Sequence, residues 1–247
     1  MAISLIIPCY NEEANIQKGV LDKIGNFTKN DKRFKEVLIV DDGSADESKS
    51  IIRTKYLSLF PKFRLIQNKH LGKAFAIIKG IQEATGETIM FSDIDLATPI
   101  EEAEKLIQLA QKEFDIVIGS RNTSREGAPL KRKIMALGMI FIRRYLIGLK
   151  GVTDTQCGFK LFQAKAAKEI VKRLQVFKSR SEVQNSSISA GFDLEFLFVG
   201  SKLGYKIAEV PVVWRHVETK NVTFFQSSLE GLKDILMIKW YDICKKY

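Results

Sequence analysis

Strand-like and helix-like segments alternate along the first half of this 247-residue chain, and this alternation restricts its fold more than any other feature. The apolar run over residues 2–7 is nearly continuous, as expected for a strand that is covered on both faces of a sheet. Strands that alternate with helical patterns predict a mostly parallel sheet with helices on both faces, which is an α/β fold. The predicted strands cover residues 2–7, 36–40, 63–67, 86–91 and 115–119.

Polar residues gather where four of these strands end. Ligands of open α/β sheets bind beyond the carboxyl ends of the strands, so the four clusters are expected to line one site. A single cluster is easily a surface accident, but four at one edge of a sheet are much harder to explain in that way. The clusters are residues 10–12, 41–42, 70–73 and 93–95.

The last of these clusters contains two carboxylates, Asp93 and Asp95. Side chains two positions apart in an extended segment point the same way, so these two are expected to project together. Two like charges repel unless a cation lies between them, and Mg²⁺ or Mn²⁺ takes one or two carboxylates together with water and phosphate oxygens. The alternative is that Asp93 caps a turn and Asp95 is solvated, because a pair of this spacing is common by chance.

Two nucleotide-binding classes are disfavoured by the residues after the first strand. Pro8-Cys9-Tyr10 stands where a dinucleotide-binding fold has G-x-G-x-x-G, which argues against NAD or FAD. The phosphate-binding loop G-x-x-x-x-G-K-[ST] does not occur in the chain either.

Composition narrows the partners and the compartment. The formal net charge of +10 predicts an anionic partner such as a nucleotide phosphate, a nucleic acid or a membrane surface. Three widely spaced cysteines indicate a reducing compartment. No signal peptide and no run of 18 apolar residues are expected from the sequence. A basic RNA-binding module is disfavoured, because no aromatic and basic strand motif of the RNA-recognition kind is present.

Two sets of motifs stand out along the chain. The early motifs are Ile6-Ile7-Pro8-Cys9-Tyr10-Asn11-Glu12-Glu13, Val40-Asp41-Asp42-Gly43-Ser44-Ala45-Asp46 and Asp93-Ile94-Asp95. The later ones are Thr155-Gln156-Cys157-Gly158-Phe159-Lys160-Leu161-Phe162, Gly191-Phe192-Asp193-Leu194-Glu195 and Glu209-Val210-Pro211-Val212-Val213-Trp214. The early set resembles the inverting family-2 glycosyltransferases of the GT-A fold, which is Rossmann-like. The later set looks like the dolichyl-phosphate β-glucosyltransferase branch of that family, and the match runs from about residue 3 to 220.

The resemblance implies a metal-dependent enzyme that transfers glucose from UDP-glucose to dolichyl or another polyprenyl phosphate, with inversion. A GDP-mannose-dependent enzyme, and a non-catalytic protein that senses nucleotide sugars, are the alternatives. Asp93 and Asp95 would hold the divalent cation, Mg²⁺ or Mn²⁺, that bridges the diphosphate of the donor. The other residues implied for the nucleotide sugar are Pro8, Tyr10, Asn11, Glu12, Asp41, Gly72 and Lys73. Asp42 is expected to shape the turn before Gly43 instead.

The acceptor side rests on fewer residues. Arg121 is the expected contact to the acceptor phosphate, and Arg132 and Lys160 are further basic candidates. Asp193 matches the position of a general base, but an acceptor phosphate is already anionic at neutral pH and needs positioning more than deprotonation. A base and an orienting carboxylate therefore both remain open for Asp193.

Two stretches are candidates for the membrane surface. Residues 129–150 are predicted to form a basic amphipathic helix, which either lies in a membrane interface or packs on the core. The final stretch, residues 221–247, is predicted to be an amphipathic helix that follows a GT-A domain of residues 1–220; it either docks on that domain or rests on the bilayer. The protein is accordingly expected to be cytoplasmic and peripheral on the cytoplasmic face of a membrane, with an anionic membrane surface and no nucleic acid among its partners.

Overall fold

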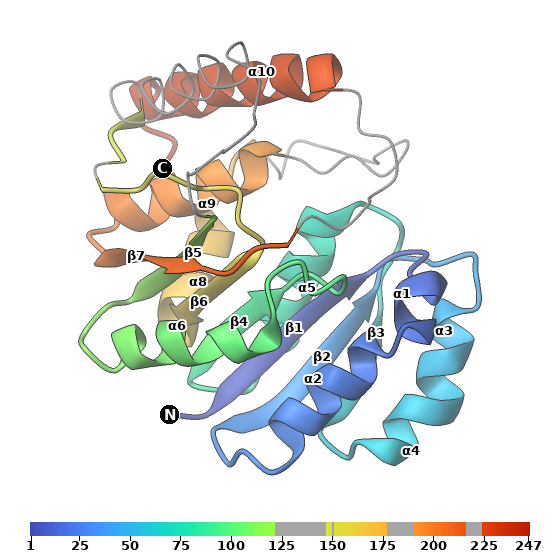
Figure 1. The fold of residues 1–247 in the computed structure, drawn as a ribbon. Helices are drawn as coiled ribbons and strands as arrows, with labels where there is room; N and C mark the ends of the chain where they lie inside the picture. The colour runs from blue at the N-terminus through green and yellow to red at the C-terminus, as the bar shows by residue number, and fades with distance from the viewer. Residues whose placement is uncertain (122–146, 150, 177–189, 216–223) are drawn as a thin grey trace.

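The computed structural model describes residues 1–121, 147–149, 151–176, 190–215 and 224–247, and these form an α/β fold (Figure 1). The strands are β1 (Ile3–Cys9), β2 (Phe34–Asp41), β3 (Phe63–Gln67), β4 (Thr88–Ser92), β5 (Ile116–Arg121), β6 (Phe159–Gln163) and β7 (Ile207–Val212). The α-helices are α1 (Glu13–Gln17), α2 (Val20–Lys29), α3 (Ser48–Ile51), α4 (Leu57–Leu59), α5 (Lys73–Glu83), α6 (Ala103–Ala110), α8 (Ala164–Arg173), α9 (Ala190–Lys202) and α10 (Phe224–Ile243). A π-helical turn, η1 (Ile52–Tyr56), and a 3₁₀ turn, η2 (Ile100–Glu102), complete the described elements.

The strands form one seven-stranded sheet in the order β3-β2-β1-β4-β6-β5-β7. Each of the five predicted strands is present, and the mostly parallel α/β fold is confirmed. Two strands were not predicted: β6, which runs antiparallel between β4 and β5, and β7, which pairs in parallel with β5. The signal of β6 is weak because Lys160 interrupts its apolar run, although Lys160 is itself buried.

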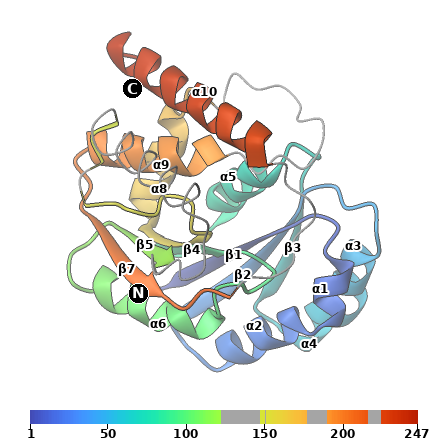
Figure 2. The same cartoon turned by 45° about the horizontal axis from the view of Figure 1, so that its top comes forward.

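Helices cover both faces of the sheet, as Figures 1 and 2 show. Successive side chains of a strand point to opposite faces, so Ile6 packs with α5 while its neighbours Leu5 and Ile7 pack with α2. The core on the first face also contains residues of α8 and α9, and the core on the second contains residues of α1 and α6. The central strands are therefore buried on both faces, which leaves their ends as the places where polar side chains can gather.

Helix α10 lies alongside α9, on the outside of the layer that α9 forms (Figure 2). Its inner side chains Ile235 and Ile238 belong to the core, and Asp234 is buried against Gly191 at the start of α9. A Cβ atom at Gly191 would lie 2.1 Å from Oδ2 of Asp234, so only glycine permits this approach. The predicted C-terminal helix thus docks on the rest of the chain. The division at residue 220 stays a prediction, because residues 216–223 lie outside the described part.

Two other expectations concern membranes. The predicted basic helix over residues 129–150 falls almost wholly outside the described residues. Among the helices that the structure does describe, none is both long and apolar enough to cross a bilayer.

The close approach of α5 to the sheet gives a test of this packing. A Cβ atom at Gly80 would lie 2.6 Å from Cγ2 of the fully buried Ile6. We expect Gly80→Val to lower the free energy of unfolding by about 1–3 kcal/mol through overpacking. Gln82→Val, at an exposed position of the same helix, introduces the same side chain without the contact and should change it far less. Denaturant unfolding measures the free energy of unfolding of both variants. If both lose the same amount, helix propensity and not the contact with Ile6 determines the change.

Candidate active site

Strands β1, β2 and β4 run parallel, so their carboxyl ends meet at one edge of the sheet. Tyr10 lies directly after β1, Asp41 ends β2, Asp93 follows β4, and Lys73 begins α5. The structure therefore brings the predicted strand-end clusters to one edge. We call this edge the rim, and it consists of residues 10–12, 41–42, 68–73 and 93–95.

Hydrogen bonds join the first two loops of the rim. The backbone N–H of Asn11 donates to Oγ of Ser44 at 3.0 Å, and the N–H of Ala45 donates to Oδ1 of Asn11 at 2.8 Å. Asn11 has φ +53°, a left-handed conformation that asparagine adopts more readily than most residues. Asp41 is buried and accepts a hydrogen bond from the N–H of Ser44 at 3.2 Å. Asn11 and Asp41 thus hold the shape of the rim, whatever else they bind.

The other predicted nucleotide residues near β1 have different exposures. Pro8 is buried within the strand, and Tyr10 and Glu12 are half-buried after it. The ring of Tyr10 stacks on that of His70, with centroids 4.0 Å apart and planes at 13°. This pair gives the rim an aromatic face of the kind on which planar rings stack.

Asp42 organises the loop that leads into α5. Its Oδ1 accepts hydrogen bonds from Nδ2 of Asn68 at 2.9 Å and from the N–H of Leu71 at 3.2 Å. Its Oδ2 accepts one from the N–H of Gly72 at 2.7 Å and lies 3.0 Å from Nδ1 of His70. The carboxylate is buried, so these bonds fix where α5 begins. Asp42 was expected to shape only the turn before Gly43, whereas its carboxylate fixes the whole loop that leads into α5.

Lys73, the first residue of α5, meets the carboxylate of Asp93. Its Nζ lies 2.5 Å from Oδ1 of Asp93. Burial of the ammonium lowers the pKa of Lys73, but the charges of Asp93, Asp193 and Asp95 outweigh this and raise it above its ordinary value. On its other side, Asp93 lies against Gly158, where a Cβ atom would come within 2.1 Å of Oδ2. Lys73 and Gly158 together set the position of Asp93.

Asp93 and Asp95 lie on a turn and not on the strand, contrary to the alternation argument. Strand β4 ends at Ser92, and the N–H of Leu96 donates to the carbonyl of Asp93 at 3.3 Å. Oδ1 of Asp95 accepts the N–H of Ala97 at 3.0 Å. Burial raises the pKa of Asp95 above its ordinary value, and the nearby charge of Asp93 adds to this despite the Ala97 hydrogen bond. The two carboxylates are thus close, as predicted, but for a different geometric reason.

These two carboxylates suit a divalent cation that is completed by ligands from outside the protein. Oδ1 of Asp93 is buried, and its partner in this structure is the ammonium of Lys73, a positive charge of the kind that a cation would add. Within the described residues, no group of three or more His, Cys, Asp or Glu side chains gathers to form a complete metal site. Magnesium commonly takes one or two carboxylates plus phosphate and water, and a site of this kind needs no third carboxylate.

Lys160 and Asp193 form a buried ion pair next to this cluster. Nζ of Lys160 lies 2.6 Å from Oδ1 of Asp193 and donates to the carbonyl of Cys157 at 2.5 Å. The Lys160 side chain is only 2% exposed, whereas Asp193 is 17% exposed. A buried ammonium is costly unless it is paired and hydrogen-bonded, so Asp193 is held in place by the charge of Lys160.

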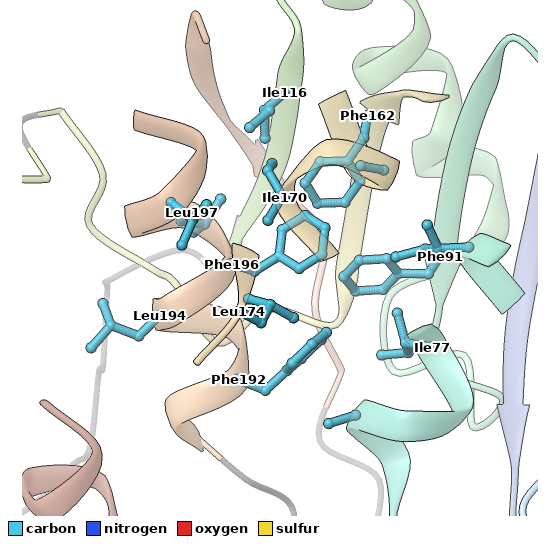
Figure 3. Close-up of a cluster of buried hydrophobic side chains, with 14 of the residues drawn as sticks. Ile77, Phe91, Ile116, Phe162, Ile170, Leu174, Phe192, Leu194, Phe196 and Leu197 are labelled. Carbon is cyan, nitrogen blue, oxygen red and sulfur yellow. The ribbon is translucent and has the colours of Figure 1, made fainter. Parts of the chain in front are cut away.

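Aromatic side chains beneath the charges align β4, β6 and α9 (Figure 3). Phe91 of β4 stacks on Phe162 of β6 at 5.6 Å, and Phe162 meets Phe196 of α9 edge-on at 4.9 Å. Phe196 in turn contacts Phe192 at 5.6 Å. Because Phe91 lies two residues before Asp93 and Phe192 directly precedes Asp193, this packing sets the position of both carboxylates.

Arg121, at the end of β5, is held by Asp154. Its Nε and Nη2 donate to the two oxygens of Asp154 at 2.7 and 2.8 Å. Burial alone raises the pKa of Asp154, but the hydrogen bonds and charge of Arg121 bring it below its ordinary value. Glu209 of β7 accepts the N–H groups of Thr153 and Asp154, and the Arg121 guanidinium lies 5.8 Å from the ring centre of Trp214. Arg121 therefore presents its remaining edge, with Nη1, in a fixed direction.

Sequence reasoning missed the residues that position the others. Asp154 was not singled out, His70 appeared only within a strand-end cluster, and Gly158 and Glu209 appeared only within motifs. Gly158 was the one with a usable signal, since a glycine beside a buried strand often marks close approach of another group. Arg132, a candidate for the acceptor phosphate, lies outside the described residues.

Comparison with known proteins adds the family. Residues 4–171 match the family model of glycosyl transferase family 2. A dolichyl-phosphate β-glucosyltransferase of Trichomonas vaginalis is 36% identical over 87% of this chain and 66% of its own length. Those of Dictyostelium discoideum and Homo sapiens are 31% and 32% identical over 96% of this chain and 74% of their lengths. The chain thus spans about two thirds to three quarters of these relatives.

Solved structures show the same fold. The glucosyl-3-phosphoglycerate synthase of Mycobacterium tuberculosis, determined with Mn²⁺, UDP and glucosyl-3-phosphoglycerate, superposes with a TM-score of 0.65 at 17% identity. The match covers 96% of this chain and 79% of that one. The family expected from the strand-end motifs is confirmed by the model match and the relatives together: the protein belongs to glycosyl transferase family 2.

Proposed function

We propose that the protein transfers glucose from UDP-glucose to dolichyl phosphate or a related polyprenyl phosphate, with inversion at the anomeric carbon. The supporting observation is the arrangement of charges around Asp93. A first set of charges consists of the carboxylates Asp93 and Asp95 and of Lys73 at the start of α5. A second set lies next to it and consists of two ion pairs, Lys160 with Asp193 and Arg121 with Asp154. The first set suits the diphosphate of a donor and the second suits an anionic acceptor.

On the donor side, the nucleoside stacks or packs near Tyr10, with Pro8, Asn11, Glu12 and Asp41 lining the base and ribose pocket. The support for this assignment is the aromatic face of Tyr10 and His70 beside the buried Asp41. The diphosphate lies at the start of α5, where the N–H of Lys73 and the helix dipole favour anions, while the N–H of Gly72 is used by Asp42 to fix the loop. Lys73 adds a positive charge to that position.

A divalent cation held by Asp93 and Asp95 would stabilise the negative charge of the departing nucleoside diphosphate. Solved complexes of the M. tuberculosis synthase with UDP include one with Mn²⁺ and one with Mg²⁺, which supports a divalent cation in the proposed donor site. In the present chain, Lys73 neutralises part of the charge of the two carboxylates. Lys73 would stabilise the diphosphate together with such a cation.

On the acceptor side, Arg121 contacts the phosphate through the edge that Asp154 does not occupy. A guanidinium binds phosphate well through two parallel N–H groups, and Asp154 fixes its orientation for that contact. Asp193 orients the incoming sugar or acceptor, and Lys160 positions Asp193 from below. A phosphate monoester is already an anion, so the reaction needs charge screening along the approach more than a general base.

The enzyme is proposed to work as a peripheral protein on the cytoplasmic face of a membrane, because a polyprenyl phosphate acceptor resides there.

The first test of the proposed function screens UDP-glucose, UDP-galactose and GDP-mannose against a short polyprenyl phosphate with Mg²⁺ or Mn²⁺. We expect transfer from UDP-glucose to exceed the others at least about tenfold, which corresponds to roughly 1.4 kcal/mol. Preferred transfer from GDP-mannose would overturn the donor assignment and leave the family intact.

The metal assignment predicts that Asp95→Asn folds normally but loses transfer. An amide keeps the size of the side chain yet cannot neutralise a cation, so UDP binding in the presence of Mn²⁺ should weaken as well. Glu101→Gln, an exposed substitution in the following turn η2, is the matched control and should behave as wild type. Isothermal titration with UDP and Mn²⁺, alongside activity, measures the effect. Wild-type turnover that persists in EDTA would refute the assignment.

The acceptor assignment predicts which of two variants is the more damaged. Arg121→Ala removes the cation that screens an approaching phosphate, whereas Asp193→Asn keeps an oxygen that can accept from Lys160. We expect Arg121→Ala to lower kcat/KM for polyprenyl phosphate more than Asp193→Asn, whose loss should stay below the roughly 10²–10⁴-fold of a missing general base.

Two controls separate chemistry from folding in that comparison. Asp154→Asn should weaken the hold on Arg121 and raise KM for the acceptor with a smaller effect on kcat. Thermal unfolding of each variant checks that an unpaired Lys160 or Asp154 has not destabilised the fold. A nearly inactive Asp193→Asn beside a nearly normal Arg121→Ala would reverse the assignment and indicate an acceptor that needs deprotonation.

A further inference from the structure

Helix α10 is apolar on two opposite sides, and only one of them is covered. Its inner side chains, Ile235 and Ile238, are 1% and 0% exposed against the core. Its outer side chains are large, apolar and open to solvent. These are Leu232 at 40%, Leu236 at 58%, Trp240 at 65% and Ile243 at 67% exposed, and we call them the outer ridge.

The outer ridge is continuous along the helix. Its members follow one another at intervals of four, four and three residues, which places them on one face of an α-helix over about 16 Å. Single exposed apolar side chains are normal on a soluble protein, but a contiguous row of four marks an interaction surface. A second apolar partner besides α9 would cover this row.

Charges beside the ridge indicate what this partner is. At 100° per residue, Lys233 falls on one flank of the ridge and Lys239 on the other. Of the acidic residues in this part of α10, Asp234 is buried, and the charge of Asp242 is neutralised by its ion pairs with Lys202 and with Lys239 itself. An apolar row flanked by lysines suits the boundary of an anionic bilayer, where acyl chains take the row and headgroups take the ammonium groups.

A second copy of the chain fits this surface less well. Two ridges packed face to face would bring the flanking lysines of both copies close together, and like charges oppose association. The formal net charge of +10 adds to that repulsion, whereas it adds to the attraction of an anionic membrane.

The position of the ridge relative to the rim is suitable for a lipid acceptor. Asp234, on the inner side of α10, lies against Gly191, two residues before Asp193. Helix α10 thus crosses the start of α9, the helix that carries Asp193 (Figure 2). A bilayer against the outer ridge would lie one helix layer away from the proposed acceptor site.

We propose that the outer ridge of α10 lies in the interface of an anionic bilayer and holds the enzyme there. The bilayer contact follows from the ridge and its lysines alone. The further statement, that this contact delivers a membrane-bound acceptor, rests on the proposed function.

Tryptophan fluorescence tests the contact directly, because the chain has two tryptophans, Trp214 and Trp240. Trp214→Phe leaves Trp240 as the single reporter in the intact protein. The test vesicles contain phosphatidylcholine with about 30% phosphatidylserine. Binding to them should shift the emission of Trp240 to the blue, and lipids brominated on the acyl chain should quench it. If the emission of Trp240 stays unchanged at a saturating concentration of anionic vesicles, the proposal is overturned.

Vesicle sedimentation with variants tests whether the ridge carries the affinity. Leu236→Glu with Trp240→Glu should lower the partition coefficient at least about 30-fold, because two apolar side chains leave the interface and two anions enter. Leu59→Glu, at a 51% exposed leucine of α4 away from α10, controls for the added charge and should have little effect (Figure 1). Equal binding by the double variant and wild type would refute the proposal. The proposal would also be refuted if wild type is a dimer in sedimentation equilibrium, the double variant is a monomer, and both bind vesicles equally.

Activity assays keep this inference separate from the proposed function. The double variant should lose transfer to long-chain polyprenyl phosphate in vesicles but retain transfer to a short-chain, water-soluble phosphate acceptor. Equal loss on both acceptors with normal vesicle binding would contradict a membrane role for the ridge. If wild type transfers glucose to neither acceptor while Trp240 still enters the bilayer, the proposed function fails and the membrane contact stands.

Discussion

The buried pair of Lys160 and Asp193 is the interaction on which the arrangement of the charged site depends. Lys160 belongs to β6, the antiparallel strand between β4 and β5, and Asp193 belongs to α9. An ammonium that is 2% exposed is tolerated only with good partners, and the Cys157 carbonyl and the Asp193 carboxylate supply them. The pair therefore ties the inserted strand, the loop before it and the helix above it into one arrangement. Gly158 in that loop then contacts Asp93, so the position of this carboxylate depends on the same arrangement.

The two halves of the site are stabilised in different ways. On the donor side, neighbouring loops hold one another through backbone hydrogen bonds, as Asp42 does for the loop before α5. On the acceptor side, side chains hold side chains: Glu209 fixes the backbone at Asp154, and Asp154 fixes Arg121. A cation held by charged hydrogen bonds keeps its direction. In the proposed function, the loops fix the donor pocket and these ion pairs fix the cations beside it, which suits an acceptor that arrives as a phosphate.

Helix α10 connects this site to the outside of the molecule. Its inner face completes the packing around α9 through Ile235 and Ile238, and its buried Asp234 lies at the start of that helix. The same helix turns four large apolar side chains outward. One element thus packs against the helix that carries Asp193 and also carries the surface that we propose for a membrane. The sequence predicted an amphipathic helix here but did not reveal that its packing residues lie on the side opposite the exposed row.

The sequence by itself determined the α/β fold, the rim and the family. Strand and helix periods were clear for β1 to β5, and parallel strands bring their ends to one edge whatever the details of packing. It also indicated Asp93 and Asp95 as neighbours, although by strand alternation and not by the turn that follows Ser92. Tertiary structure decided the rest. Strand β6 was hidden because a buried lysine looks exposed until its partner Asp193 is known, and that partner lies 33 residues away. Asp154, Gly158 and Glu209 act through contacts between distant segments, and no local pattern encodes which segments will meet.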